Sequence, residues 1–215
     1  MLREYFKISN LFKFDEKYKN VVGLNDDFNY LKDNIWIGTE KIDGTNIRIC
    51  WDGHRISIMG HTAKSIIPSN LIEYLNSLFL TQEMEYVFEQ MFQEKEVCIY
   101  CEGYGYKIQT NGDKYIKNKE CSIIIFDIFI NGFYLRRESV NDIAFKLGLQ
   151  SVPIVFEGTI KEAVEFVSQH QMSTLNGGLH EMEGIVLETK YPLYNAKGFP
   201  IKCKIKYQDL VKAGL

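Results

Sequence analysis

The segment EKIDGTN, residues 40–46, places Lys41 directly before a run of alternating apolar residues. A fully buried ammonium group is costly unless it is paired. A lysine exposed to solvent at the edge of a hairpin would avoid that cost. The alternative is a lysine nucleophile, which needs a fold that supplies a phosphate pocket and favours the neutral amine. The segment alone leaves both interpretations open.

Further charged residues follow at points where predicted strands begin, break or end: Glu102, Asp127, Glu183, and the alternating lysines Lys202, Lys204 and Lys206. Lysines two apart lie on one face of a strand, where they can hold a phosphate together. A solvent-exposed, lysine-rich edge strand that resists aggregation is the alternative for these three. Asp127 interrupts an apolar run, so it requires a partner or an opening to solvent.

Taken in order, the segments EKIDGTN, YCEGYG, IIIFDIF, EMEGIVLE and IKCKIKYQDL resemble the covalent nucleotidyltransferase superfamily, which includes ATP-dependent RNA and DNA ligases and mRNA capping enzymes. The resemblance is strongest to the RNA ligase 2-like family and covers nearly the whole chain from about residue 35. Asn46 replaces the arginine more usual in DNA ligases and capping enzymes, which favours the RNA-ligase branch. The resemblance implies an RNA-joining enzyme of the kind that acts in RNA repair.

In such an enzyme Lys41 is the nucleophile and forms a lysyl–AMP phosphoramidate. Glu183 would coordinate Mg²⁺ or Mn²⁺, which suits a hard carboxylate ligand. Lys204 and Lys206 would hold the α-phosphate of ATP, although a shift of two residues would bring Lys202 into the pair instead. The resemblance implies further nucleotide contacts from Glu40, Ile42, Asn46, Arg48, Glu102 and Phe126.

Several of these roles have a plain alternative. Glu102 is expected to bind the ribose hydroxyls, and Phe126 to stack on adenine unless it is an ordinary core aromatic. Glu40 either senses the adenine amino group or is solvated. Arg48 either reaches a phosphate or forms a surface ion pair.

Three other features bear on the site. Asp43 and Gly44 are interpreted as the turn that presents Lys41. His61 stands where the family commonly has an arginine; because histidine is largely neutral at pH 7, its step would be slower or served by Arg48 or Lys64. The basic loop over residues 107–119 is a candidate for touching a nucleic-acid backbone, with a solvated loop as the alternative.

Apolar periodicity predicts the elements that must position these residues. Strands are expected at 35–37, 46–50, 55–59, 96–102, 121–130, 133–135, 184–188 and 201–207. Asp52-Gly53 and Asn131-Gly132 predict hairpin turns. A helix pair is expected over residues 71–93 with a break near Thr81, and helix-start signals lie at Ser139 and Thr159. The expected fold class is α+β, with antiparallel sheets flanked by helices in an ATP-grasp-like adenylation domain.

Composition limits the class of protein. With 215 residues and 46% hydrophobic content, the simplest organisation is a single nucleotidyltransferase domain over residues 1–215, without a C-terminal OB or helical domain. The net charge of −3 means that a nucleic-acid partner must meet a local basic surface. No apolar run approaches the length of a membrane span, and the N-terminus lacks a signal peptide's apolar core, so we expect a cytoplasmic protein with no membrane partner.

The five cysteines are interpreted as reduced core residues. Cys98 and Cys101 form a CxxC pattern that could bind zinc. No second Cys/His pair accompanies it, and strand alternation directs the two thiols to opposite faces.

The sequence therefore predicts an ATP-dependent RNA ligase that uses ATP as AMP donor with Mg²⁺ or Mn²⁺. It would be a monomer that adenylates a 5′-phosphate and joins it to a 3′-hydroxyl, with RNA favoured over DNA. The alternatives are a DNA ligase, a GTP-dependent capping-type guanylyltransferase, and a non-enzymatic protein that binds nucleic-acid ends with a retained nucleotide pocket.

Overall fold

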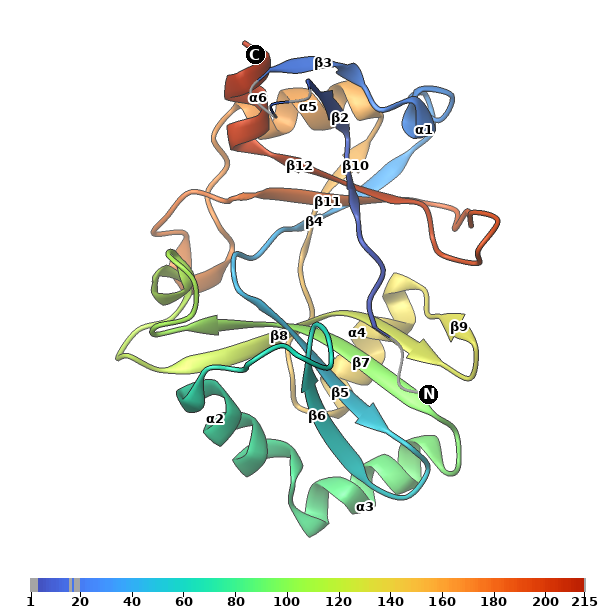
Figure 1. Cartoon of the computed structure of the whole chain (residues 1–215), viewed down its shortest axis with the longest axis vertical. Helices are drawn as coiled ribbons and strands as arrows, with labels where there is room; N and C mark the ends of the chain where they lie inside the picture. The colour runs from blue at the N-terminus through green and yellow to red at the C-terminus, as the bar shows by residue number, and fades with distance from the viewer. Residues whose placement is uncertain (1–3, 16, 18–19, 215) are drawn as a thin grey trace. The chain divides into compact units, whose positions relative to one another are not determined.

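The computed structural model describes residues 4–15, 17 and 20–214 (Figure 1); residues 1–3 at the N-terminus lie outside them. The described residues form two compact units. Unit 1 contains Asp43–Val152 together with Glu4 and Tyr5, and unit 2 contains the described residues of Phe6–Ile42 and of the chain from Pro153 onward. Each unit has its own hydrophobic core.

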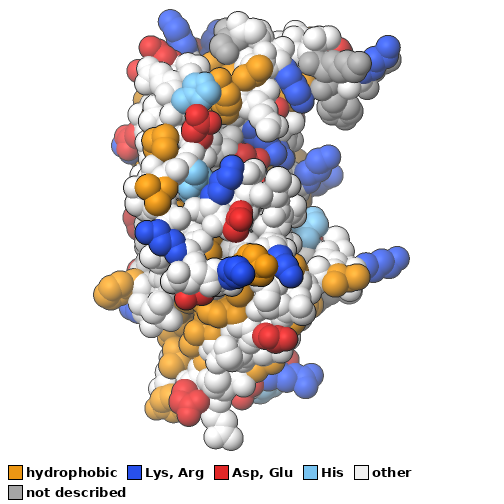
Figure 2. Space-filling view, turned by 90° about the vertical axis from the view of Figure 1, so that its left-hand side faces the viewer, with side chains coloured by type: hydrophobic (Ala, Val, Ile, Leu, Met, Phe, Trp, Pro, Cys, Tyr) orange, Lys and Arg blue, Asp and Glu red, His pale blue; other side chains and the backbone are white. Residues whose placement is uncertain are grey.

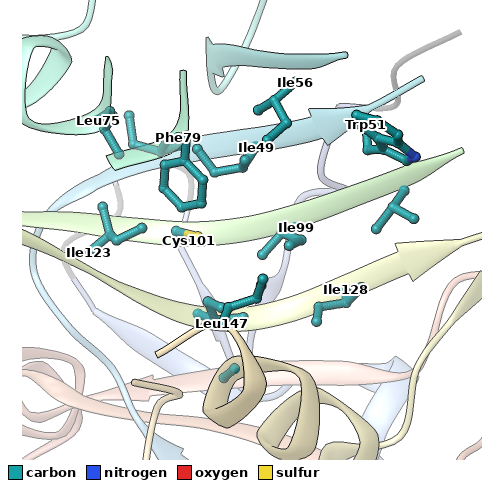
Figure 3. Packing of buried hydrophobic residues seen from close by; sticks show 14 of the residues in the cluster. Ile49, Trp51, Ile56, Leu75, Phe79, Ile99, Cys101, Ile123, Ile128 and Leu147 are labelled. Carbon is teal, nitrogen blue, oxygen red and sulfur yellow. The ribbon is translucent and has the colours of Figure 1, made fainter. Parts of the chain in front are cut away.

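Unit 1 is built on an antiparallel sheet in the order β6-β5-β7-β8-β9. Its strands are β5 (Thr45–Trp51), β6 (Ile56–Gly60), β7 (Val97–Gly105), β8 (Cys121–Ile130) and β9 (Phe133–Tyr134). Helices α2 (Ser69–Phe79), α3 (Gln82–Phe92) and α4 (Arg137–Lys146) contribute to the core on one face of this sheet, part of which is drawn in Figure 3. Alternate strand residues such as Ile49, Ile99 and Ile128 enter this core, so their neighbours belong to the other face.

Unit 2 is built on a mixed sheet in the order β1-β12-β11-β4-β10. Its strands are β1 (Ser9–Asn10), β4 (Trp36–Glu40), β10 (Ile154–Gly158), β11 (Gly184–Thr189) and β12 (Lys202–Lys206), beside a small hairpin of β2 (Phe12–Phe14) and β3 (Val21–Leu24). The helices are α1 (Asp26–Asn29), α5 (Ile160–Ser168) and α6 (Tyr207–Ala213); short 3₁₀ turns occur at Gly112–Tyr115 in unit 1 and Leu175–Gly177 in unit 2. Trp36, Ile185 and Ile205 pack with α5 and α6 in the core.

The alternation of β12 separates apolar from charged residues. Cys203 and Ile205 are fully buried in the core of unit 2, so Lys202, Lys204 and Lys206 lie on the other face of the sheet. The strand pairs with β1 on one side and β11 on the other. The alternative of an exposed edge strand is therefore wrong, because β12 has a neighbour on both sides.

The predicted α+β class, with antiparallel sheets and flanking helices, is confirmed. Both predicted hairpin turns are present between paired strands. The helix break at Thr81 is confirmed, since its side chain caps α3 by accepting a hydrogen bond from the Met84 N–H at 3.1 Å. Thr159 and Glu162 form the predicted capping box of α5.

One prediction at an element boundary is wrong, and some short elements were not predicted. Helix α4 begins at Arg137 without a side-chain cap, two positions before the start signal at Ser139. The buried Arg137 guanidinium donates to the Phe126 carbonyl at 2.8 Å, a tertiary contact that local sequence does not encode. Strand β10 and helix α6 were not predicted, because five and seven residues give too little periodicity.

All five cysteines are free thiols, as predicted. Cys101 packs in the core of unit 1, whereas Cys98 lies on the other face with its Sγ 3.0 Å from Cys50 Sγ. Among the described residues, no helix has both the length and the apolar character needed to cross a membrane. Acidic and basic side chains are interspersed on the face shown in Figure 2, in keeping with the small net charge.

Replacing Gly184 with alanine is expected to destabilise unit 2. Gly184 has φ +154°, and a Cβ atom there would lie 2.0 Å from the Ile205 carbonyl oxygen, so β11 and β12 would have to separate. We expect a loss of about 3 kcal/mol in the free energy of unfolding, measured by urea denaturation.

Gly198→Ala is the matched control, because Gly198 also has positive φ (+75°) but a Cβ atom there would meet nothing within 4 Å. Its expected cost is about 1 kcal/mol, from the backbone conformation alone. An equal loss of unfolding free energy in the two variants would contradict the claim that the close approach of β12 to Gly184 requires glycine.

Candidate active site

An ion cluster forms where β4, β11 and β12 end side by side. Lys41 Nζ lies 2.5 Å from Glu183 Oε2, and Lys206 Nζ lies 2.7 Å from Glu183 Oε1. The Lys41 N–H donates to the Gly184 carbonyl at 2.9 Å, and Gly184 is opposite Lys206 in the β11–β12 pairing. The two lysines therefore share the Glu183 carboxylate.

The electrostatics of Glu183 follow from its position. Its side chain is only 19% exposed, and burial alone would raise the pKa of the carboxyl group. The adjacent ammonium groups of Lys41 and Lys206 outweigh burial, so the pKa of Glu183 is lowered. The carboxylate is therefore ionised at neutral pH and neutralises part of the positive charge of the cluster.

Lys204 is the cation of the row without a counterion. It is half-buried and forms no ion pair among the described residues. Burial, followed by repulsion from Lys206 and Lys41, lowers the pKa of its ammonium group. A half-buried ammonium group near two other lysines can bind an anion such as phosphate.

Lys202 is placed differently from the other two lysines. Its side chain is 4% exposed and forms an ion pair with Glu188 at 2.9 Å, on the opposing position of β11. Lys206, by contrast, contacts the same carboxylate as Lys41. This geometry favours the pair Lys204 and Lys206 over the register that includes Lys202.

Glu40 is only 1% exposed, so the alternative that it is solvated is wrong. Its carboxylate oxygens accept hydrogen bonds from the Ser173 hydroxyl at 2.5 Å, the Thr174 N–H at 2.9 Å and the Thr174 hydroxyl at 2.6 Å. Ile42, two residues further on, is buried. Neither Ser173 nor Thr174 was identified from the sequence, because a contact spanning more than a hundred residues leaves no periodic signal.

Asn46 and Glu102 occupy opposing positions on β5 and β7 in unit 1. Side chains at opposing positions on one face lie within contact distance. The Asn46 Oδ1 atom is buried and has no hydrogen-bond partner among the described residues. Gly44 makes room for this arrangement, since a Cβ there would lie 2.2 Å from the Gly103 carbonyl oxygen and 3.0 Å from Glu102 Cγ.

A β-bulge in β8 explains the sequence Phe126-Asp127. Tyr100 pairs with Asp127 and the next residue of β7 pairs with Ile125, which leaves Phe126 outside the strand pairing. A bulge of this kind places two consecutive side chains away from the core. Phe126 belongs to neither hydrophobic core, which argues against the alternative that it is an ordinary aromatic residue of the core.

Asp127 has the partner that its apolar surroundings required. It is 1% exposed and accepts a hydrogen bond from the Tyr5 hydroxyl at 2.9 Å. The Tyr5 ring also meets the Phe126 ring edge-on, with centroids 4.9 Å apart. Tyr5 thus closes an aromatic cluster on the face of the sheet that also carries Glu102, a role that the sequence did not indicate.

Asp43 does more than form a turn. Its N–H donates to the Tyr115 hydroxyl at 3.0 Å, and its carboxylate accepts from the Asn111 side-chain amide at 3.0 Å. The basic loop over residues 107–119 is therefore anchored to the EKIDGTN segment. Lys107 and Lys119 both lie over the Tyr106 ring, so part of the positive charge of the loop contacts an aromatic face.

The remaining basic candidates separate into one buried and two exposed side chains. Arg48 is 2% exposed, and its Nε donates a hydrogen bond to the Gly60 carbonyl at 2.8 Å. The alternative that Arg48 forms an ion pair at the surface is therefore wrong. His61 and Lys64 are exposed in the turn after β6.

The donor set can be tested against a divalent cation. Among the described residues, no three His, Cys, Asp or Glu side chains come together in a metal-binding group. Glu183 is one hard carboxylate whose two oxygens contact ammonium groups. Glu183 fits Mg²⁺ or Mn²⁺ as a ligand of the kind found in nucleotide-dependent sites, where one carboxylate, phosphates and water complete the coordination. One of the two lysines would have to move away from the carboxylate for the metal ion to bind.

Comparison with known proteins shows the family to which this chain belongs. A protein-family model described as RNA ligase matches residues 34–204, which is most of the chain. The chain therefore belongs to the RNA ligase family. Comparison with curated protein sequences found no match.

Solved structures of Naegleria gruberi RNA ligase have a similar fold. The structure with PPi has a TM-score of 0.62 and 15% identity over 99% of this chain and 60% of that chain. A variant with AMP and Mn has a TM-score of 0.62 and 17% identity over 88% of this chain and 55% of that one. An apo variant has a TM-score of 0.60 and 15% identity, and this chain covers 53% of its length. The chain thus spans between half and two thirds of these ligases.

Replacing Glu183 with glutamine is expected to destabilise the protein in a pH-dependent way. At pH 7 the wild type should be more stable by about 2 kcal/mol, because the variant leaves two lysines facing a neutral amide. Since the pKa of Glu183 is lowered by folding, its stabilisation is complete above the ordinary value of about 4.3 and is lost as the pH falls through the folded-state value. The free energies of unfolding of the wild type and the variant should therefore approach each other at low pH. Urea denaturation between pH 7 and pH 3 measures this change.

Glu157→Gln is the control for this experiment. Glu157 pairs with Lys190 on the same sheet, but its side chain is 51% exposed. We expect no more than about 0.5 kcal/mol at any pH. A pH-independent difference between wild type and Glu183→Gln would contradict the ion cluster.

Replacing Lys204 with methionine is expected to stabilise the fold at pH 7. Because burial and the neighbouring lysines lower the pKa of Lys204, its charge is unfavourable in the folded state. We expect the melting temperature to rise by about 2–4 °C, which corresponds to about 1 kcal/mol in a chain of this size. The gain in stability should shrink as the pH rises towards the ordinary lysine pKa of about 10.4.

Lys190→Met is the control, because Lys190 forms an exposed ion pair, and it should give no such gain. A loss of stability in Lys204→Met would contradict the claim that the charge of Lys204 is unfavourable in the folded state.

Proposed function

We propose that this chain is an ATP-dependent RNA ligase whose nucleophile is Lys41. The observation that carries the proposal is the shared carboxylate of Glu183, which holds Lys41 and Lys206 at adjoining strand ends. Beside them, Lys204 forms no ion pair among the described residues and is the proposed contact for a phosphate. Family membership supports the same reaction class. We further propose that the chain constitutes a nucleotidyltransferase domain.

The chemistry would proceed in three balanced steps. The neutral Lys41 amine attacks the α-phosphorus of ATP; an N–P bond forms as the amine loses a proton to solvent, and the bond to pyrophosphate breaks. An oxygen of an RNA 5′-phosphate then attacks the lysyl-bound AMP, and the N–P bond breaks as the amine regains a proton. A 3′-hydroxyl finally attacks the adenylated 5′-phosphate, losing its proton as AMP leaves.

Each charged residue of the cluster has a task in the first step. Lys204 and Lys206 would hold the α-phosphate oxygens and stabilise the charge that develops there. Glu183 holds the Lys41 ammonium before reaction, so this ion pair must open when the amine loses its proton. A divalent cation held by Glu183 would screen the phosphate charge and favour the neutral amine.

The nucleotide contacts proposed in unit 1 rest on separate observations. Asn46 Oδ1 is a buried acceptor without a partner among the described residues, and it lies beside Glu102. Both can accept hydrogen bonds from ribose hydroxyls. Phe126 is partly exposed and outside the cores, which suits stacking on adenine. The buried Arg48 is proposed as a further phosphate contact.

Incubation with Mg²⁺ and α-labelled ATP or GTP tests the proposal. We expect label from ATP to remain on the denatured protein and to be released by acid, as a phosphoramidate requires. Lys41→Ala should abolish labelling, because it removes the amine that forms the N–P bond. Lys190→Ala is the control and should label as the wild type does. Labelling from GTP alone would favour a capping-type enzyme, and absence of label with both nucleotides would overturn the enzymatic proposal.

A further inference from the structure

We infer that Glu40 is a positioning residue that fixes Glu183 against Lys41, rather than a residue that reads the adenine base. The inference rests on the proposed function of Lys41. Its basis is the buried Glu40 carboxylate, which is 1% exposed and accepts hydrogen bonds from Ser173 and Thr174. We call this set of contacts the Glu40 clamp.

The clamp engages a segment that leads directly to Glu183. Residues 171–182 fold back on themselves, because the Met182 N–H donates to the Gln171 carbonyl and the Ser173 N–H donates to the His180 carbonyl, both at 2.8 Å. An antiparallel bridge between Met172 and Glu181 joins the two arms. Holding Ser173 therefore holds the far arm, which continues without interruption into Glu183.

The clamp and the sheet connect Glu40 and Lys41 to the chain on both sides of Glu183. On the sheet side, Glu40 is opposite Ile185, and the Lys41 N–H donates to the Gly184 carbonyl. On the other side, the Glu40 side chain reaches the segment that precedes Glu183. Glu183 is thus fixed from both directions, and each fixing contact begins at Glu40 or its neighbour.

The hydrogen-bonding capacity of Glu40 argues against base recognition. An ionised carboxylate only accepts, and it offers about four lone-pair sites. One oxygen already accepts two hydrogen bonds and the other accepts one. All three donors are neutral groups of one short segment, and Glu40 forms no ion pair among the described residues. The carboxylate is committed to protein groups whose own donors would be left unsatisfied by its withdrawal.

Glu40→Gln tests the inference, because a glutamine amide presents a donor where the clamp requires an acceptor. We expect the rate constant for lysyl–AMP formation to fall about 10–100-fold, the range typical of supporting contacts around a reactive site. The KM for ATP should stay within about twofold, and the preference for ATP over GTP should be unchanged, since Glu40 touches no nucleotide. The melting temperature of each variant shows whether a lower rate constant results from unfolding of the protein.

The double variant Ser173→Ala/Thr174→Val removes the two hydroxyl groups that donate hydrogen bonds to Glu40. It should show the same fall in rate constant without a change in KM. Adding Glu40→Gln to it should give a triple variant no slower than Glu40→Gln alone, because all three changes break one unit. Additive effects, or a changed ATP-to-GTP preference in Glu40→Gln, would overturn the inference.

Hydrogen–deuterium exchange provides a readout that does not depend on ATP chemistry. The Thr174 and Met182 amides should exchange faster in Glu40→Gln than in the wild type, while Glu157→Gln, at an exposed ion pair of the same sheet, should leave them unchanged. Unchanged exchange in Glu40→Gln would overturn the clamp. If the wild type fails to form lysyl–AMP but exchange responds as expected, the proposed function fails and the clamp remains.

Discussion

The candidate site depends on one half-buried carboxylate that neutralises two ammonium groups. Without Glu183, Lys41 and Lys206 would repel each other at adjoining strand ends, and Lys204 already has an unfavourable charge there. Lys41, Lys204 and Lys206 outnumber Glu183, so this cluster has an excess of positive charge. The ion pair also holds the Lys41 ammonium group beside the Glu183 carboxylate.

The backbone makes this concentration of charge possible. Three strand ends must align, and glycine is required where they approach most closely. Gly184 allows β11 and β12 to pair beneath the carboxylate, and Gly44 allows the EKIDGTN segment to pass against β7. Asp43 then anchors the basic loop through Tyr115 and Asn111. The polar residues of the segment therefore serve architecture as much as chemistry, with Lys41 as the group proposed for reaction.

Local sequence predicted what local physics determines. The hairpin turns, the helix break at Thr81 and the capping box at Thr159 each depend on a few neighbouring residues, and all are confirmed. The start of α4 was misplaced because the tertiary contact of Arg137 overrides a local cap. The solvated alternative for Glu40 failed for a related reason, since its partners lie far along the chain.

The site itself was predictable in part. The resemblance suggested Lys41, Glu183, Lys204 and Lys206 as site residues, and their roles stay predictions. The pairing of β4, β11 and β12 explains why residues so distant in sequence meet. The bulge at Phe126 and the contact of Tyr5 with Asp127 were not predictable, because each arises from the register between strands or from long-range packing. The most direct test is tandem mass spectrometry of peptides from protein incubated with ATP and Mg²⁺. We expect one adenylate group, carried by Lys41; an adenylate on Lys204 or Lys206 instead would contradict the role proposed for Lys41.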